Sequence, residues 1–148
     1  MNYRNPTPTI DAILQKGSRI LMVRRKKDPF KGMLALPGGF VNEGETVEDA
    51  VKREVLEETS LEIEPINILG VYSDPHRDPR MHTMTVVFVS IITGGKEKAE
   101  DDASNLEWVE LADVKKAAFD HALIIADYRQ WRGDSAATTY WSTKRRHD

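Results

Sequence analysis

Three glutamates, Glu54, Glu57 and Glu58, lie within about one helical turn of each other near the middle of a 148-residue chain. Like charges at this spacing repel and destabilise a helix. At about 100° per residue, the three side chains fall within an arc about 120° wide that continues the apolar side marked by Val47 and Val51. We therefore expect the three carboxylates to face inward and not toward solvent.

Clustered carboxylates in a partly desolvated cleft must either take up protons or bind a cation. Oxygen ligands without nearby histidine or cysteine favour a hard ion, Mg²⁺ or Mn²⁺. Mg²⁺ bound by a few carboxylates, with water in its other positions, is typical of sites that act on phosphates. The helix alone leaves an alternative open, a solvated face with ion pairs between neighbouring turns.

Residues upstream extend the pattern. From Gly39 the chain runs through five residues to Glu45, through seven more to Arg53, and on as Arg-Glu-Val-Leu-Glu-Glu-Thr-Ser-Leu to Leu61. This closely resembles the Nudix box, Gly-x5-Glu-x7-Arg-Glu-U-x-Glu-Glu-x-Gly-U, in which U is apolar. Every defined position matches except Ser60, which stands where the family has glycine.

The resemblance implies the Nudix fold, an α+β fold with a mixed β-sheet sandwiched between helices, and hydrolysis of a nucleoside diphosphate linked to another group. It implies that the three glutamates are metal ligands and that the Gly39 carbonyl is a further one. Glu57 or Glu58 would also help to deprotonate the attacking water. Arg53 would orient the glutamates, and Glu45 would hold Arg53 in a salt bridge.

Ser60 bears on the end of the helix and not on the ligands. Glycine at this position normally adopts a left-handed conformation. A serine adopts it at a cost of about 1 kcal/mol, unless the helix ends differently. We expect activity to survive either way.

The substrate must be inferred from the flanking loops. The stretch VYSDPHRDPRMH, residues 71–82, resembles the YSDPxRDPRxH stretch of microbial ADP-ribose pyrophosphatases, and DPFKGMLALPGGFV and FDHALII are similar to that subgroup too. The resemblance implies Mg²⁺-dependent hydrolysis of ADP-ribose to AMP and ribose 5-phosphate. Two alternatives stay open: another Nudix pyrophosphatase, acting on NADH, a dinucleoside polyphosphate or a damaged nucleoside triphosphate, and a domain that senses ADP-ribose without hydrolysing it.

Several basic side chains are candidates for contacting such a substrate. Arg77 and Arg80 have the forked geometry that clamps phosphate oxygens, although RDPR is also compatible with an internally paired turn. Arg24, the first residue of the internal RRKK cluster, is a candidate anion contact. His82 is a candidate substrate contact or a structural histidine, and His121 has the same two interpretations.

The aromatic and acidic candidates are less specific. Phe30 or Phe119 would stack on adenine, but Phe119 is equally compatible with the core. Many enzymes of this kind take a further carboxylate from a distant loop as general base or extra ligand. KEKAEDDAS, residues 96–104, is the obvious donor, and the subgroup resemblance favours Asp101 and Asp102 over its other acids.

Hydrophobic periodicity predicts the elements that must position these residues. It indicates strands at 7–14, 19–26, 66–73, 82–92 and 106–111, with 66–73 buried and 82–92 central. A further strand at 33–41 is interrupted by Pro-Gly-Gly. Thr46 and Asp49 resemble a capping box that begins a helix over 46–59, and a second helix is expected over 120–132.

Composition limits the class of protein. A length of 148 residues with 40% hydrophobic and 30% charged residues predicts one folded domain over 1–148, with 139–148 as a basic tail. There is no cysteine, and no apolar run reaches the roughly 18 residues of a membrane span. The net charge of −3 argues against a nucleic-acid binder. We expect a cytoplasmic protein with a small nucleoside diphosphate derivative as its partner, and the resemblance adds a homodimer.

Overall fold

The computed structural model describes residues 3–97, 105–134 and 139–141, which form eight strands, two α-helices and a short 3₁₀ helix. The elements in chain order are β1 (Thr7–Lys16), β2 (Arg19–Arg24), β3 (Leu34–Ala35), β4 (Gly38–Phe40), α1 (Val47–Thr59), β5 (Leu61–Tyr72), β6 (Thr83–Gly95), β7 (Leu106–Glu110), the 3₁₀ helix η2 (Leu111–Asp113), α2 (His121–Arg132) and β8 (Tyr140–Trp141).

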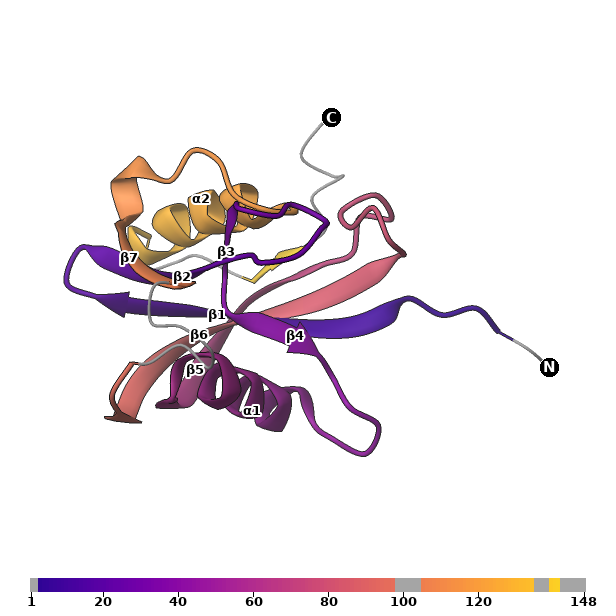
Figure 1. Cartoon of the computed structure of the whole chain (residues 1–148), viewed down its shortest axis with the longest axis horizontal. Helices are drawn as coiled ribbons and strands as arrows, with labels where there is room; N and C mark the ends of the chain where they lie inside the picture. The colour runs from indigo at the N-terminus through magenta and orange to yellow at the C-terminus, as the bar shows by residue number, and fades with distance from the viewer. Residues whose placement is uncertain (1–2, 98–104, 135–138, 142–148) are drawn as a thin grey trace.

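Strand β1 joins the two parts of the sheet. Residues 9–11 pair with β4, residues 7–14 run parallel to β6, and the last residues of the strand form a hairpin with β2. The strand order is β3-β2-β1-β6-β5-β8, with β7 added beside β2. Helices α1 and α2 lie on opposite faces of this sheet (Figure 1). The predicted α+β architecture, a mixed sheet between helices, is confirmed.

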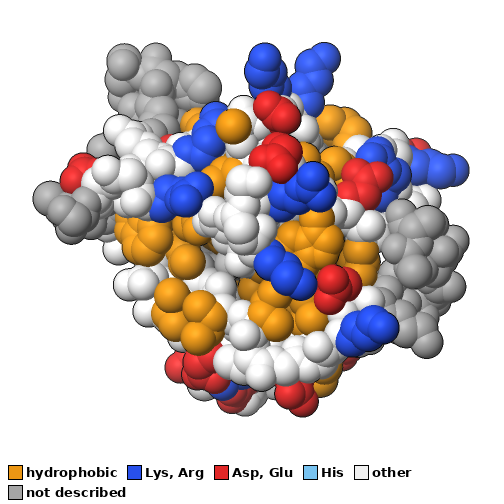
Figure 2. Space-filling view, turned by 90° about the vertical axis from the view of Figure 1, so that its left-hand side faces the viewer, with side chains coloured by type: hydrophobic (Ala, Val, Ile, Leu, Met, Phe, Trp, Pro, Cys, Tyr) orange, Lys and Arg blue, Asp and Glu red, His pale blue; other side chains and the backbone are white. Residues whose placement is uncertain are grey.

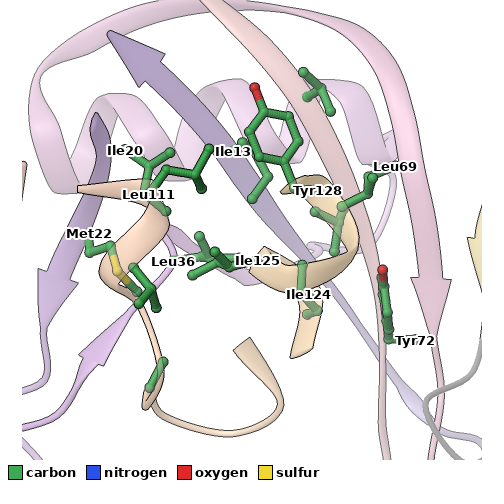
Figure 3. Packing of buried hydrophobic residues seen from close by; sticks show 14 residues of the cluster. Ile13, Ile20, Met22, Leu36, Leu69, Tyr72, Leu111, Ile124, Ile125 and Tyr128 are labelled. Atoms are coloured by element: carbon green, nitrogen blue, oxygen red, sulfur yellow. The ribbon is translucent and has the colours of Figure 1, made fainter. Parts of the chain in front are cut away.

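Each face of the sheet carries its own apolar core, because successive side chains of a strand point to opposite faces. On the α1 face, Ile10 and Leu14 of β1 pack with Val51 and Val55. On the α2 face, Ile13 packs in the cluster that contains the α2 residues Ile124, Ile125 and Tyr128, as Figure 3 shows.

The predicted interruption is a bend at Pro37, after which Gly38 and Gly39 begin β4 and lie pressed against β1. We call Pro37-Gly38-Gly39 the glycine turn. The Ala12 amide donates to the Pro37 carbonyl at 2.9 Å. A Cβ atom on Gly38 would lie 2.2 Å from the Ile10 carbonyl oxygen and 2.4 Å from Asp11 Oδ1. Only glycine therefore fits between the turn and β1.

Both ends of α1 are closed as the sequence indicates. The Thr46 hydroxyl accepts from the Asp49 amide at 3.1 Å. Ser60 has φ 65° and ψ 12°, and its amide donates to the Leu56 carbonyl at 2.9 Å. Serine has thus taken the left-handed conformation that glycine normally supplies at a helix end.

Three sequence expectations need correction. Strand β5 begins at Leu61, earlier than the predicted 66, and Ile66 and Ile68 are about half exposed, so the prediction of a buried strand is wrong for them. Tyr140 and Trp141 pair with β5 as β8, so the basic tail does not begin at 139. The remaining tail residues, 142–148, lie outside the described part of the chain.

The surface shows no segregation of charge on the face seen in Figure 2, where lysine and arginine side chains lie among aspartate and glutamate. Within the part of the chain that the structure describes, neither helix is long and apolar enough to cross a membrane.

The left-handed Ser60 predicts a stabilising substitution. Ser60→Gly should raise the free energy of unfolding by up to about 1 kcal/mol, because glycine adopts this conformation without a Cβ penalty. Urea denaturation measures the change, with Ser60→Ala as the control, since alanine keeps the Cβ and is not expected to stabilise. A glycine variant less stable than the starting protein would contradict this account of the helix end.

Candidate active site

A cleft of about 300 Å³ opens beside the Gly38-Gly39 turn. Strand β1, the turn, helix α1, the loop before β6 and the residues that lead into α2 all contribute to it. Its lining residues are Thr9, Asp11, Arg25, Ala35, Leu36, Gly38, Gly39, Phe40, Glu54, Arg77, Asp78, Arg80, Thr83, Phe119 and His121. We call it the first cleft.

A second cleft, of about 330 Å³, shares part of this lining. The residues common to both are Arg25, Ala35, Leu36 and Gly38. Glu54 lines the first cleft, whereas Glu58 lines the second. The two clefts therefore meet at the glycine turn.

Helix α1 brings two of the three clustered glutamates against this turn. A Cβ atom on Gly39 would lie 2.5–2.7 Å from the Glu54 carboxylate, and Glu58 accepts from the Gly38 amide at 3.2 Å. Glu57 is different, because its side chain is 54% exposed. The expectation that all three face inward is wrong for Glu57, which lies about 120° from Val51 on the helix, at the rim of the buried arc.

Burial and mutual repulsion make these carboxyls hard to ionise. Burial raises the pKa of Glu58 well above its ordinary value, and the neighbouring Glu54 and Asp11 raise it further. Burial also raises the pKa of Glu54, although Arg53 opposes this shift. For Asp11, burial raises the pKa to about 7 against the opposing charge of Arg77. The site thus holds three carboxyl groups whose joint ionisation needs a compensating positive charge.

Arg53 supplies part of that charge. Its guanidinium binds both oxygens of Glu45, at 2.7 and 3.0 Å, and donates to Glu54 at 2.9 Å and to Glu57 at 3.2 Å. It also donates to the Phe40 carbonyl at 3.0 Å. The predicted ion pair between Glu45 and Arg53 is present, and Arg53 links α1 to β4.

Asp11 is not among the site residues predicted from the sequence, although a charged residue inside the apolar stretch TPTIDAIL is a signal for it. Asp11 accepts from the Thr85 hydroxyl at 2.7 Å, and its other oxygen lies 3.7 Å from His121 Nε2. His121 Nδ1 accepts from the Leu36 amide at 2.9 Å. Burial, with smaller contributions from Arg77 and a second arginine, lowers the pKa of His121 to about 3. A neutral His121 thus anchors the glycine turn to α2.

Aromatic and basic side chains form another part of the lining of the first cleft. The guanidinium carbon of Arg25 lies 4.8 Å from the ring centroid of Phe119, and that of Arg80 lies 5.8 Å from the same ring. Arg80 also lies 5.7 Å from the ring of Phe40. Phe30 packs edge-on against Phe119 at 4.9 Å and does not line the first cleft itself. Phe119 and Arg80 were predicted from the sequence by number, and Arg25 belongs to the RRKK cluster, residues 24–27, that was predicted as an anion contact.

Two predicted phosphate contacts are paired internally. Arg24 forms a forked pair with Glu107 on the neighbouring strand, at 2.8 and 2.9 Å. Arg77 is buried, binds both oxygens of Asp120 at 2.8 and 2.9 Å, and donates to the Thr83 hydroxyl at 2.6 Å. Each guanidinium thus holds two strands or loops together in this structure, and the phosphate contacts of Arg24 and Arg77 stay predictions.

The loop before β6 is paired internally, which is the alternative to phosphate binding that the RDPR sequence left open. Arg80 pairs with Asp78 through both carboxylate oxygens, at 3.1 and 2.9 Å, as expected for an internally paired turn. His82 Nε2 lies 2.9 Å from the Ser73 carbonyl, so it ties the two ends of the loop together and is not a substrate contact here. Arg80 still lines the first cleft.

The donor set fits a hard cation, the kind of group that the carboxylate pattern indicates. Glu54 and Glu58 offer oxygen ligands whose ionisation a cation would favour. The close approach of Gly39 to Glu54 permits no side chain between backbone and carboxylate. In 3–97, 105–134 and 139–141, no three acidic or histidine side chains already converge on one point. Asp101 and Asp102 lie outside the described residues.

Known proteins share this sequence and fold. The family model described as NUDIX domain matches residues 5–128. A protein of Methanocaldococcus jannaschii named ADP-ribose pyrophosphatase is 50% identical over 130 residues, 88% of this chain and 77% of the relative.

Two solved structures match with the same TM-score of 0.74. The NUDIX domain of Shewanella oneidensis NrtR complexed with ADP ribose is 30% identical, covering 88% of this chain and 90% of that one. A bifunctional NMN adenylyltransferase/ADP ribose pyrophosphatase of Francisella tularensis, complexed with AMP and a Mn ion, is 28% identical, covering 88% and 43%.

The buried His121 predicts a pH-dependent cost of substitution. His121→Asn keeps an acceptor near the Leu36 amide but cannot be protonated. The low pKa of folded His121 means that its contribution to stability is complete above pH 6.5 and is lost as the pH falls toward 3. The loss of unfolding free energy caused by His121→Asn should therefore shrink by about 1.4 kcal/mol per pH unit below 6.5. Urea denaturation at pH 7.5, 6 and 5 measures it, and a loss independent of pH would contradict it.

Proposed function

This chain belongs to the NUDIX family and is a hydrolase of that family, and from this premise we propose that it hydrolyses ADP-ribose to AMP and ribose 5-phosphate. The identity of 50% to an ADP-ribose pyrophosphatase supports the substrate, as does the likeness to a NUDIX domain that binds ADP ribose.

The observation that carries this proposal is that the first cleft combines two kinds of lining. Glu54 and the Gly38-Gly39 turn form one part of it, and two guanidinium groups against the ring of Phe119 form another. ADP-ribose carries an anionic diphosphate between an aromatic base with its ribose and a second ribose. Guanidinium groups complement the diphosphate, and an aromatic ring complements the base.

We propose that Mg²⁺, with Mn²⁺ as a substitute, is held by Glu54, Glu58 and the Gly39 carbonyl, with Glu57 reaching it from the rim. When bound, such an ion neutralises charge on phosphate oxygens and lowers the pKa of a coordinated water. Arg53 keeps Glu54 oriented through its own anchor on Glu45. We propose that Asp101 or Asp102 is the general base that accepts a proton from the attacking water.

The products of hydrolysis decide between this function and its alternatives. Incubation with Mg²⁺ and a panel of ADP-ribose, NADH, a dinucleoside polyphosphate and oxidised dGTP, followed by chromatography, should show AMP and ribose 5-phosphate formed fastest from ADP-ribose. Consumption of a triphosphate while ADP-ribose stays intact would show that the substrate is wrong. Tight binding of ADP-ribose without any product would instead indicate a sensor.

Glu58→Gln should lower the activity of the enzyme without lowering the stability of the metal-free protein. Glu58→Gln keeps an oxygen for the Gly38 amide and removes the repulsion from Glu54 and Asp11. We expect the metal-free variant to unfold at the same or a higher urea concentration, while kcat falls by about 10² or more because a metal ligand is lost. Glu48→Gln, on the exposed first turn of the same helix, is the control and should keep full activity. Full activity in Glu58→Gln would exclude Glu58 from the metal site.

A further inference from the structure

Arg25 occupies the junction of the two clefts and lines both. Its side chain is fixed by a hydrogen bond from Nε to the Pro29 carbonyl at 2.7 Å and by its position 4.8 Å from the Phe119 ring. Among the residues that the structure describes, neither Nη atom of Arg25 has a hydrogen-bond partner. Neither is a fully buried atom left unsatisfied, so both face accessible space.

The other arginines around the clefts are matched to carboxylates. Arg24 is paired with Glu107, Arg77 with Asp120, and Arg80 with Asp78. Arg25 has no ion pair of this kind within the described ranges, although it is half-buried. A desolvated guanidinium without an anion is costly.

Arg25 and Arg80 could bind one anion together. Arg25 and Arg80 approach the same aromatic ring, and their like charges repel. Burial, followed by Arg80, lowers the pKa of Arg25, while Asp78 and Glu58 oppose this shift. An anion bound between the two guanidiniums would remove the repulsion and replace the water that they lose.

We propose that Arg25 is the anion anchor of the site, donating both Nη groups to the non-bridging oxygens of the substrate diphosphate where the two clefts meet. This inference rests on the proposed function and refines it. Glu54 faces one cleft and Glu58 the other, with Gly38 between them. A diphosphate held by Arg25 at this junction lies beside both carboxylates, and the two halves of the substrate extend into different clefts.

The chemistry of the side chain makes the proposal specific. A guanidinium offers two parallel N–H groups in a rigid plane, which match two oxygens of a phosphate. A lysine at position 25 would keep the charge but lose the fork. An uncharged glutamine would lose both. The three side chains should therefore rank in the order arginine, lysine, glutamine for binding of a diphosphate.

The test compares Arg25→Gln and Arg25→Lys with Arg19→Gln as a matched control. Arg19 is the first residue of β2, the strand that ends one residue before Arg25, and its side chain is exposed. It pairs with Glu110 at 2.9 Å and lines neither cleft. We expect Arg25→Gln to raise KM for ADP-ribose by about 10- to 100-fold, Arg25→Lys to raise it less, and Arg19→Gln to leave it unchanged.

Binding in the presence of a chelator separates the anchor from a merely structural role. Titration calorimetry with ADP-ribose, inorganic diphosphate and adenosine should show that Arg25→Gln loses affinity for the first two ligands and keeps its affinity for adenosine. An equal loss for adenosine would mean that Arg25 only supports the Phe119 ring, and unchanged affinity for all three would also overturn the proposal. Wild-type protein that binds but never hydrolyses ADP-ribose would refute the proposed function alone, because the comparison of affinities would still decide the role of Arg25.

Discussion

Asp11, Glu54 and Glu58 bring three carboxyl groups to one glycine turn, where burial raises the pKa of each and nearby acidic groups add to the shift. Such a cluster stays ionised only if positive charge reaches it. The protein surrounds it with the guanidinium of Arg53, with backbone amides and with space for a cation. Gly38 and Gly39 are required because any side chain there would collide with β1 or with the Glu54 carboxylate.

The residues that hold the carboxyl cluster in place come from distant parts of the chain, which the sheet brings together. Strand β1 carries Asp11 against the turn, α1 brings the glutamates from the other side, and the start of α2 supplies His121, whose neutral ring holds the Leu36 amide. The buried pair of Arg77 and Asp120 ties the loop before β6 to the same region. The site is thus positioned by contacts between elements, and single loops contribute little on their own.

Local patterns were readable from the sequence, whereas partners distant along the chain were not. The spacing of the box residues and the start of α1 depend on helical geometry, so they could be predicted. The partners of arginines could not, since Arg77 meets Asp120 and Arg24 meets Glu107 only after the sheet has formed. Glu57 was misplaced because a helical wheel locates the rim of a buried arc only to within one residue.

The edges of the sheet have a consequence for how the chain behaves among its own copies. Strands β3 and β8, at the two ends of the main strand order, are two residues long, and within the described residues β8 pairs with Gly70 and Val71 of β5. The earlier part of β5, which has no second partner strand among the described residues, carries Glu62, Glu64 and Pro65 and is interrupted by register shifts. Charge, proline and bulges are the features that stop one sheet from adding strands of another molecule. The fold therefore resists edge-to-edge aggregation along β5.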